Sequence, residues 1–298
     1  MKRRSFGTRL QDAQMGSASV IIADGATGTM LQAAGLPPGI PPEGWLLDNA
    51  EAVLGVHRAY IDAGSELILT CTFGATRPRL ERSGLGDRLE EINHRAVEIA
   101  RKAAGNEVFV AGDIGPMGEF LAPLGDLMYQ EAVDIFAEQA SALVGAKVDV
   151  LFIETMAALE EVQAAVEGTL QVANGTPVTA TLSFDSHGRT NMGIRPEEAA
   201  EALLDLDVDA FGANCGATLD MTLEAVKTMH RLAPETPLIV KPNAGKPRMV
   251  NNEVVYDATP EDMADYARQF VALGAKIVGG CCGSTPEHIA AIAKALRS

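Results

Sequence analysis

Eight short runs of β-branched or apolar residues recur along this chain, and each is followed by a longer stretch with a helical pattern. The runs are Val20–Ala23, Leu67–Thr70, Val108–Ala111, Val150–Ile153, Val178–Ser183, Ala210–Gly212, Leu238–Val240 and Lys276–Val278. Strands buried on both faces that alternate with helices indicate a parallel sheet. No low-complexity linker divides the sequence, so the pattern predicts an α/β fold, a single-domain (β/α)8 TIM barrel over residues 19–298. A doubly wound open sheet is the alternative fold.

The helical stretches carry their own start signals. Helices are predicted over 50–63, 88–104 and 129–145, and three further helix starts read Arg195-Pro196-Glu197, Thr259-Pro260-Glu261 and Thr285-Pro286-Glu287. Proline is tolerated at a first helical position, and an acidic residue there favours the positive end of the helix dipole. The repeated start signal supports the alternation of strands and helices.

Composition excludes several classes of protein. The net charge of −16 argues against a nucleic-acid or anionic-membrane surface, and no apolar run reaches the length of a membrane span. Residues 1–18 begin with basic residues but lack the apolar core of a signal peptide, so they are predicted to be a disordered or tag-like lead. Four cysteines without a disulfide pattern fit a reducing, cytoplasmic location.

Polar residues cluster where the predicted strands end, which is where barrel active sites are built. They are Asp24, Thr70-Cys71-Thr72, Asp113, Glu154, Asp185, Asn214-Cys215, Lys241-Pro242-Asn243 and Cys281-Cys282. The sixth and eighth strands therefore bring three cysteines to one rim of the barrel. Three soft ligands leave the fourth tetrahedral position of a zinc ion open, as in catalytic sites. Cys71 is a candidate fourth ligand that would close the site, and the plainer alternative is that the cysteine pair fills space with reduced thiols.

An open three-thiolate zinc suits a particular chemistry. Its electron-rich ligand set makes it poor at activating water and suited to a soft incoming thiol. Zinc binding lowers the pKa of that thiol and leaves a thiolate near neutral pH. The matching reaction is the transfer of an alkyl group to a substrate thiol.

Six ordered motifs between Ile21 and Leu296 carry a family resemblance. They are Asp24-Gly25-Ala26-Thr27-Gly28-Thr29, Ala111-Gly112-Asp113-Ile114-Gly115-Pro116, Ile153-Glu154-Thr155, Gly212-Ala213-Asn214-Cys215-Gly216, Lys241-Pro242-Asn243-Ala244-Gly245 and Gly279-Gly280-Cys281-Cys282-Gly283. The chain resembles the homocysteine S-methyltransferase family, including the homocysteine-binding barrel of cobalamin-dependent methionine synthase.

The resemblance implies roles for individual residues. Cys215, Cys281 and Cys282 are the expected zinc ligands, and homocysteine sulfur completes the tetrahedron. Backbone N–H groups of Gly25, Ala26 and Thr27 are expected to bind the carboxylate of homocysteine. Asp24 and Glu154 are the expected partners of its α-ammonium group, and Asn243 is expected close to the metal. The alternatives are an Asp24 turn or helix cap, a structural salt bridge at Glu154, a tight turn at Gly25 and a turn residue at Asn243.

The sequence leaves the methyl donor open. Gly74 and Thr155 stand at the aromatic positions of the betaine-using branch, which counts against betaine. A separate methyl-corrinoid protein, or a small sulfonium such as S-methylmethionine, remains as the donor. Cys71 replaces the asparagine that the methionine-synthase group usually has, so a different acceptor thiol is an alternative, as is a reversed reaction that demethylates a small molecule onto a corrinoid protein.

Two rival functions are weighed against this one. Lys241 ends the seventh strand and is a candidate for Schiff-base chemistry of the aldolase type. A zinc-bound barrel that senses thiols, or serves as a subunit without catalysis, is the third possibility. The open three-cysteine set favours catalysis over sensing, and the family resemblance implies a zinc-dependent S-methyltransferase that converts homocysteine to methionine.

Overall fold

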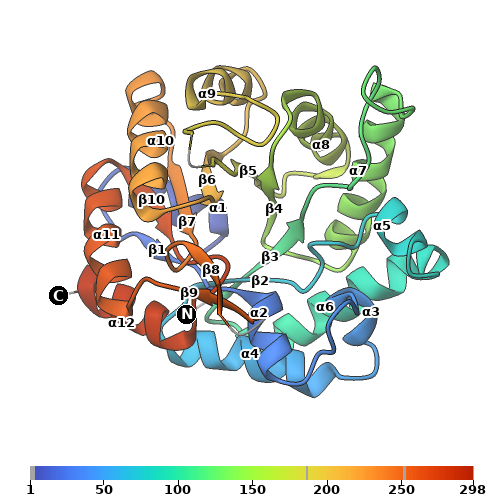
Figure 1. Cartoon of the computed structure of the whole chain (residues 1–298), viewed down its shortest axis with the longest axis horizontal. Helices are drawn as coiled ribbons and strands as arrows, with labels where there is room; N and C mark the ends of the chain where they lie inside the picture. The colour runs from blue at the N-terminus through green and yellow to red at the C-terminus, as the bar shows by residue number, and fades with distance from the viewer. Residues whose placement is uncertain (1–3, 186, 251–252, 298) are drawn as a thin grey trace.

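Eight parallel strands form one sheet in the order β1-β10-β7-β6-β5-β4-β3-β2 (Figure 1). The structure, a computed structural model, describes residues 4–185, 187–250 and 253–297. The strands are β1 (Ile21–Ile22), β2 (Leu67–Leu69), β3 (Phe109–Ile114), β4 (Val150–Met156), β5 (Val178–Leu182), β6 (Ala210–Cys215), β7 (Leu238–Pro242) and β10 (Ala275–Val278). Each strand overlaps one of the eight predicted runs.

The sheet closes where β1 meets β2. Ala23 and Leu67 form a parallel bridge, and the Asp24 amide donates a hydrogen bond to the Leu67 carbonyl at 3.0 Å. Closure removes the exposed strand edges that an open sheet would leave. The predicted (β/α)8 barrel is therefore confirmed.

Helices form the outer layer around the strands, as Figure 1 shows. They are α2 (Thr27–Ala33), α3 (Pro42–Trp45), α4 (Ala50–Asp62), α5 (Arg77–Glu81), α6 (Leu89–Ala104), α7 (Tyr129–Gly145), α8 (Leu159–Val172), α9 (Pro196–Leu204), α10 (Leu219–Leu232), α11 (Pro260–Ala272) and α12 (Pro286–Arg297), with a 3₁₀ turn at Gly86–Arg88. The three predicted proline starts are the first residues of α9, α11 and α12. Among the described residues, no helix is both long enough and apolar enough to cross a bilayer.

The N-terminal segment differs from the expected disordered lead, because α1 (Phe6–Gln14) is a helix with three buried residues. Phe6 packs edge-to-face on Phe109 of β3, with ring centroids 5.5 Å apart. Phe6 and Leu10 share a buried cluster with residues from inside the barrel, including Ile21 and Leu67. The helix thus covers apolar surface at the amino-terminal end of the barrel, which explains why it is ordered.

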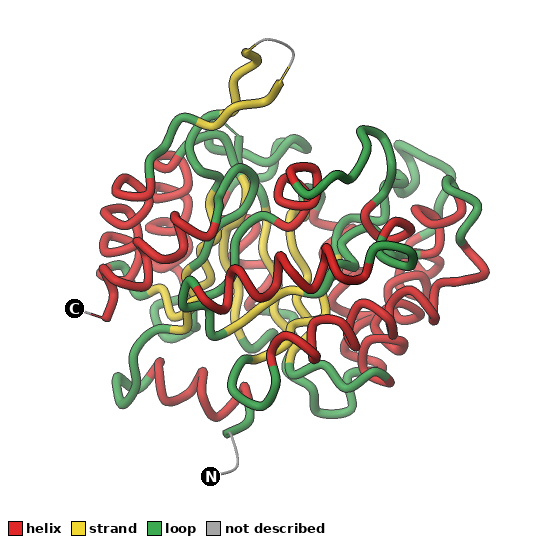
Figure 2. The backbone as a smooth tube through the Cα atoms, turned by 90° about the horizontal axis from the view of Figure 1, so that it is seen from below, coloured by secondary structure: helices red, strands yellow, loops and turns green. Residues whose placement is uncertain are grey.

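A hairpin that the sequence did not predict follows β7. Its strands β8 (Pro247–Val250) and β9 (Glu253–Tyr256) pair antiparallel, and Figure 2 shows it projecting from the end of the molecule opposite the N-terminus. Met249, Val254 and Val255 on the hairpin are exposed. The strands are only four residues each, and their described side chains at 247–249, 254 and 255 are exposed, unlike those of the barrel strands.

Candidate metal centre and substrate cavity

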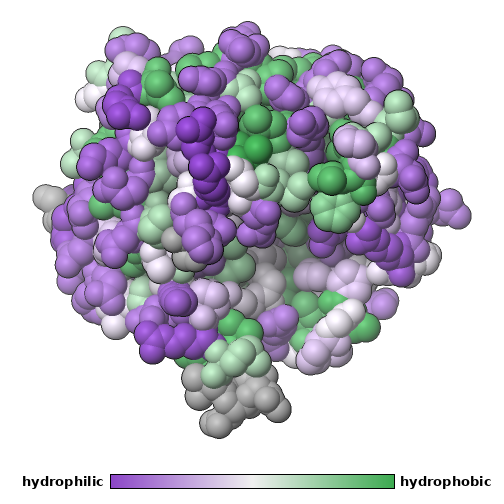
Figure 3. All heavy atoms as spheres, turned by 45° about the horizontal axis from the view of Figure 1, so that its top comes forward, coloured by the Kyte–Doolittle hydropathy of each residue, from purple (hydrophilic) through white to green (hydrophobic). Residues whose placement is uncertain are grey.

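A cavity of about 610 Å³ opens at the carboxyl ends of the strands. Its walls include residues 25–29 after β1, residues 39–43 at the start of α3, Leu69 at the end of β2, and Thr70, Cys71, Phe73 and Gly74 after it. The other strands and the residues that follow them add Asp113, Glu154, Thr155, Cys215, Lys241, Gly280, Cys281 and Cys282. Figure 3 shows hydrophilic side chains over most of one face and a hollow near its middle. The volume lies in the range of small-molecule sites.

Three cysteines meet at one side of this cavity. The sulfur atoms of Cys215, Cys281 and Cys282 lie within 4.8 Å of one another. Cys215 ends β6 with φ at 59°, a left-handed conformation, and Gly216 follows at 87°. Cys71 lines the cavity but does not belong to this group of sulfurs among the described residues. The grouping of three thiols, rather than four, matches the open ligand set predicted from the sequence.

The three thiols differ in pKa. Hydrogen bonds from Cys281 and Cys282 lower the pKa of Cys215 to about 3, while hydrogen bonds with Cys215 and Cys282, followed by burial, raise the pKa of Cys281. The hydroxyl of Tyr256, at the base of the hairpin, hydrogen-bonds the Cys282 sulfur. One sulfur is thus readily deprotonated, which is the state in which cysteine binds metal.

Asn243 supports the same corner. Its Nδ2 donates to the Gly216 carbonyl at 2.7 Å, and its side chain also hydrogen-bonds Cys215. The Oδ1 atom is buried and has no hydrogen-bond partner within the described part of the chain. A buried amide oxygen without a partner, next to three thiols, fits the surroundings of a metal ion. The donor set present therefore suits a soft cation such as zinc.

A buried ion pair lies on the other side of the cysteines. Lys241 Nζ is 3.0 Å from Asp24 Oδ1 and 3.9 Å from Glu154 Oε2, and all three side chains are buried. The second carboxylate oxygen of Asp24 accepts the Leu69 amide at 2.8 Å. Both oxygens of Asp24 are therefore engaged. Of the two acids expected to contact a substrate ammonium group, only Glu154 lines the cavity.

These charges set the protonation of the group. Burial alone would lower the pKa of Lys241, but the neighbouring charges of Asp24 and Glu154 outweigh it and raise that pKa. Burial raises the pKa of Glu154 to about 7 despite the opposing effect of Lys241. Lys241 is thus a paired ammonium ion rather than an amine nucleophile, which argues against the Schiff-base alternative.

Asn214 holds Glu154 in position. Its Oδ1 accepts the Thr155 amide at 2.8 Å, and its Nδ2 donates to Thr155 Oγ1 at 2.7 Å and approaches Glu154 Oε2 at 3.4 Å. Thr155 has φ at 63°, a conformation that is costly for a β-branched residue. The two bonds from one amide stabilise this backbone and so fix the direction of the glutamate before it.

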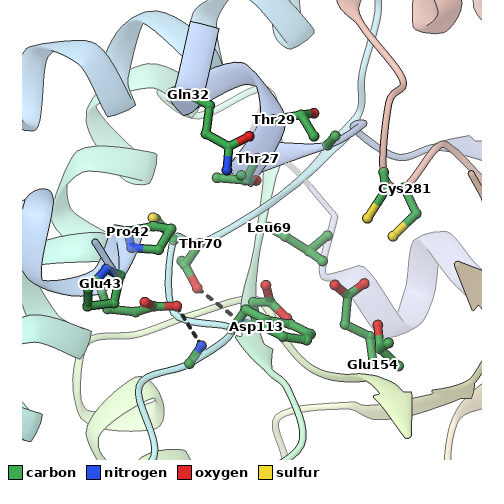
Figure 4. Close-up of a pocket in the computed structure, with 18 of the residues that line it drawn as sticks. Thr27, Thr29, Gln32, Pro42, Glu43, Leu69, Thr70, Asp113, Glu154 and Cys281 are labelled. Atoms are coloured by element: carbon green, nitrogen blue, oxygen red, sulfur yellow. Dashed lines mark hydrogen bonds between the residues drawn. The ribbon is translucent and has the colours of Figure 1, made fainter. Parts of the chain in front are cut away.

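Two other acids line the cavity. Asp113 lies between Glu43 and Glu154 in Figure 4. Glu43 from α3 is buried and accepts the Gly74 amide at 2.6 Å. A Cβ at Gly74 would come within 2.9 Å of this carboxylate, so glycine is required for the approach. Glu43 was missed in the sequence because it belongs to a four-residue helix in a proline-rich loop.

The loop after β1 forms the wall beside the cysteines. Gly25, Ala26 and Thr27 all line the cavity, and the Ala26 amide donates to Ser284 Oγ at 3.1 Å. A Cβ at Gly25 would lie 2.7 Å from the same hydroxyl, so this glycine allows close packing. The predicted carboxylate-binding loop therefore borders the cavity, with one of its three amides already engaged by Ser284.

Sequence comparison identifies relatives of this chain. A family model described as homocysteine S-methyltransferase matches residues 21–296. The chain is 30% identical over 294 residues to a methionine synthase of Mycobacterium leprae, and 31% identical over 297 residues to that of Mycobacterium tuberculosis. These alignments cover 93% and 94% of the chain but 24% and 25% of the relatives. The chain thus spans about a quarter of the length of these methionine synthases.

Structural comparison agrees. The metallated form of the homocysteine methyltransferase MmuM from Escherichia coli superposes with a TM-score of 0.80 at 28% identity, covering 97% of this chain and all of that one. A methyltransferase from Methanosarcina mazei shares the fold at 14% identity, with a TM-score of 0.67 and 99% of each chain covered. The matched model spans nearly the whole barrel and includes every cysteine of the sulfur group. This chain belongs to the homocysteine S-methyltransferase family.

Proposed function

We propose that this protein is a zinc-dependent S-methyltransferase that moves a methyl group to the thiol of homocysteine and so forms methionine. The observation that carries the proposal is the convergence of Cys215, Cys281 and Cys282 at the edge of a cavity of about 610 Å³. The three sulfur donors would hold a zinc ion and leave it able to bind a substrate thiol. Membership of the family supports homocysteine as the source of that thiol.

The proposed metal has one chemical task. Zinc held by the three cysteines supplies thiol activation, since it lowers the pKa of a thiol that binds it. No base among the chain's own residues is then assigned to the attacking sulfur. Asn243 and Tyr256 hold Cys215 and Cys282 through hydrogen bonds and so fix the direction of the sulfur donors.

The remaining residues orient the amino-acid part of the substrate. Glu154 lines the cavity and offers a carboxylate to the α-ammonium group, while Asn214 fixes its direction. Amides of the loop at Gly25, Ala26 and Thr27 border the same space and are the proposed site of the substrate carboxylate. Such positioning accounts for many kcal/mol of the barrier of an in-line transfer between two bound molecules.

The donor is proposed to be a small methyl-sulfonium such as S-methylmethionine, or a methyl-corrinoid carried on a separate protein. The cavity extends beyond the cysteines to Glu43, Phe73 and Arg79, which leaves space for a methyl donor next to the acceptor. The sulfur attacks the methyl carbon in line, and the electron pair of the broken bond leaves with the donor. A reversed reaction, which demethylates a small molecule onto a corrinoid protein, uses the same contacts.

Metal analysis and a methylation assay test the proposal. We expect about one zinc per chain in the purified protein and at least about a hundredfold weaker metal binding in Cys215→Ser, because a ligand matters more than its supporting residues. Cys71→Ser is the matched control, since it removes a cavity cysteine outside the sulfur group and should retain zinc. Full zinc occupancy in Cys215→Ser would refute the ligand assignment.

The assay then supplies homocysteine with S-methylmethionine or with a methylated corrinoid protein. Formation of methionine with one of them supports the proposal and identifies the donor. If the zinc-loaded protein binds homocysteine and methylates it with neither donor, the reversed reaction or another acceptor is favoured.

A further inference from the structure

Asp113 is a buried acid at the cavity to which the proposed reaction has given no task. Its side chain is 5% exposed and lines the cavity. Its Oδ1 atom has no hydrogen-bond partner in residues 4–185, 187–250 or 253–297. Burying a carboxylate without a partner costs stability, so a carboxylate of this kind at a cavity wall indicates that a ligand group completes it.

The main chain of Asp113 is held in place from several sides. Its amide donates to Thr70 Oγ1 at 3.0 Å, and its carbonyl accepts from Thr72 Oγ1 at 2.7 Å and Gln139 Nε2 at 3.3 Å. The carboxylate thus stands on a rigid support at the wall of the cavity. This is the arrangement expected of a preorganised acceptor of a ligand hydrogen bond.

The charges around Asp113 indicate what that ligand group carries. Asp113 and Glu154 line the cavity, Asp24 is buried beside Lys241, and the ion pairs of Lys241 go to Asp24 and Glu154. One ammonium ion therefore stands against three carboxyl groups. Burial, followed by the charge of Glu154, raises the pKa of Asp113, so a proton or a cationic ligand group is needed there.

We propose that Asp113 and Glu154 together bind the α-ammonium group of the amino-acid substrate, while Asp24 serves to hold Lys241. An ammonium group has three N–H donors and reaches two carboxylates at once. Asp113 is then a specificity residue, since it distinguishes amino-acid thiols from thiols of the same length without the amine. This inference rests on the proposed function, because it takes homocysteine as the acceptor.

Calorimetric titration of the zinc-loaded protein tests this role of Asp113 by comparing two ligands that differ only in the amine. Homocysteine and 4-mercaptobutyrate have the same thiol, chain and carboxylate. We expect Asp113→Asn to bind homocysteine at least about tenfold more weakly than wild type, the effect of a lost charge-assisted hydrogen bond. The affinity for 4-mercaptobutyrate should stay within about twofold, because that ligand offers Asp113 no donor.

Glu161→Gln is the matched control. Glu161 is also a buried acid, its Oε1 accepts the Met117 amide at 3.0 Å, and it does not line the cavity. The ratio of the two affinities should be that of wild type in this variant. Asp113→Ser provides a second removal of the carboxylate if Asp113→Asn does not fold, and zinc content is measured for each variant.

The outcomes separate the two proposals. Unchanged homocysteine binding in Asp113→Asn, or an equal loss for both ligands, would overturn the role of Asp113 in ammonium binding. A wild-type protein that holds zinc yet binds no homocysteine would instead refute the proposed function, and the role of Asp113 with it.

Discussion

The two ends of this barrel are built from the same strands but from opposite kinds of residue. At the amino-terminal end, Phe6 and Leu10 of α1 pack with Ile21, Leu67 and Phe109 in a buried apolar cluster. At the carboxyl-terminal end, buried acids, a buried lysine and three cysteines surround a cavity. Apolar contacts at the amino-terminal end stabilise the fold. At the carboxyl-terminal end, burial of charged and polar groups lowers the free energy of unfolding.

The change from one kind to the other happens along single strands. Side chains on a strand alternate between faces, so residues two apart point the same way. On β4 the inward series runs Val150, Phe152, Glu154, and on β7 Ile239 is followed by Lys241. Lys241 Nζ lies 5.4 Å from the centre of the Phe152 ring, so the layers are in direct contact. The apolar layer is thus the support on which the ionic layer is placed.

Among the variants that test the difference between the two ends, removal of the buried Lys241 cation is expected to change stability most. Lys241→Met leaves Asp24 and Glu154 buried without their counter-ion, and we expect the free energy of unfolding at pH 7.5 to fall by about 4 kcal/mol. The loss should shrink toward pH 5.5, where the unpaired acids take up protons. Urea unfolding at both values measures it.

A double variant provides the control for that loss. Asp24→Asn combined with Lys241→Met removes the two charges of the shorter ion pair, and the carboxamide oxygen introduced by Asp24→Asn can still accept the hydrogen bond of the Leu69 amide. We expect the double variant to recover most of the stability that Lys241→Met loses, since replacing a whole buried pair is nearly neutral in other proteins. Wild-type stability in Lys241→Met itself would mean that the ionic layer contributes nothing to the fold.

Truncation at the apolar end tests the other half of the comparison. Phe6→Ala removes the ring that packs on Phe109, and a loss of about 3 kcal/mol is expected for a buried phenylalanine. Zinc content and homocysteine affinity should remain those of wild type, because this residue lies at the end of the barrel away from the cavity. Thermal unfolding and calorimetry give the two readouts, and unchanged stability would show that α1 is dispensable.

Alternation along strands explains how much of the site was readable in the sequence. The strand ends identified Asp113, Glu154, Lys241 and Cys281 as polar residues following apolar runs, and the structure brings them to one cavity. Cys215 does not follow the rule, since the inward series of β6 runs Ala210, Gly212, Asn214. Its left-handed backbone turns it toward the other cysteines, and no periodicity predicts that.

Other features depend on contacts that no local pattern contains. The helix α1 is ordered because the barrel end offers it apolar surface. The sequence alone shows only that this segment lacks the apolar core of a signal peptide, which does not predict a helix. Glu43 approaches the cavity because Gly74, far along the chain, has no side chain. Asp24 was expected at the substrate, and its pairing with Lys241 depends on the closure of β1 onto its neighbours.

Substitution of Asn214 tests whether its hydrogen bonds to Thr155 keep Glu154 in position at the cavity. Asn214→Ala removes the amide that bonds Thr155 twice, and we expect a loss of about 2 kcal/mol in stability and about tenfold in homocysteine affinity. Thr181→Val is the matched control, because Thr181 donates to the same Asn214 oxygen at 2.7 Å and makes no hydrogen bond to Glu154 within the described residues. It should lose about 1 kcal/mol and keep its affinity. Equal affinity losses in both variants would contradict the assignment.

The effect of His57 is absent at neutral pH and appears only at low pH. His57 is buried in α4 with no hydrogen-bond partner for Nε2 within the described residues, and burial lowers its pKa to about 4. The unfolded chain, with a histidine pKa near 6.5, therefore binds more protons between these values, and stability falls as pH falls through that window. Relative to His57→Leu, wild type should lose up to about 1.4 kcal/mol per pH unit below pH 6.5.

Glu154 at the cavity and His57 in α4 make stability depend on pH with opposite signs. The raised pKa of Glu154 makes the folded protein bind a proton more readily and so favours folding as pH falls, whereas His57 opposes it. The difference between wild type and His57→Leu cancels every other titrating group, so its slope reports His57 alone. Parallel unfolding curves from pH 7.5 to pH 4.5 would show that the histidine is solvated in the folded protein. If stability falls with pH as expected, the surroundings of His57 in the folded protein disfavour a positive charge. At the cavity end, by contrast, a positive charge is buried together with its counter-ions.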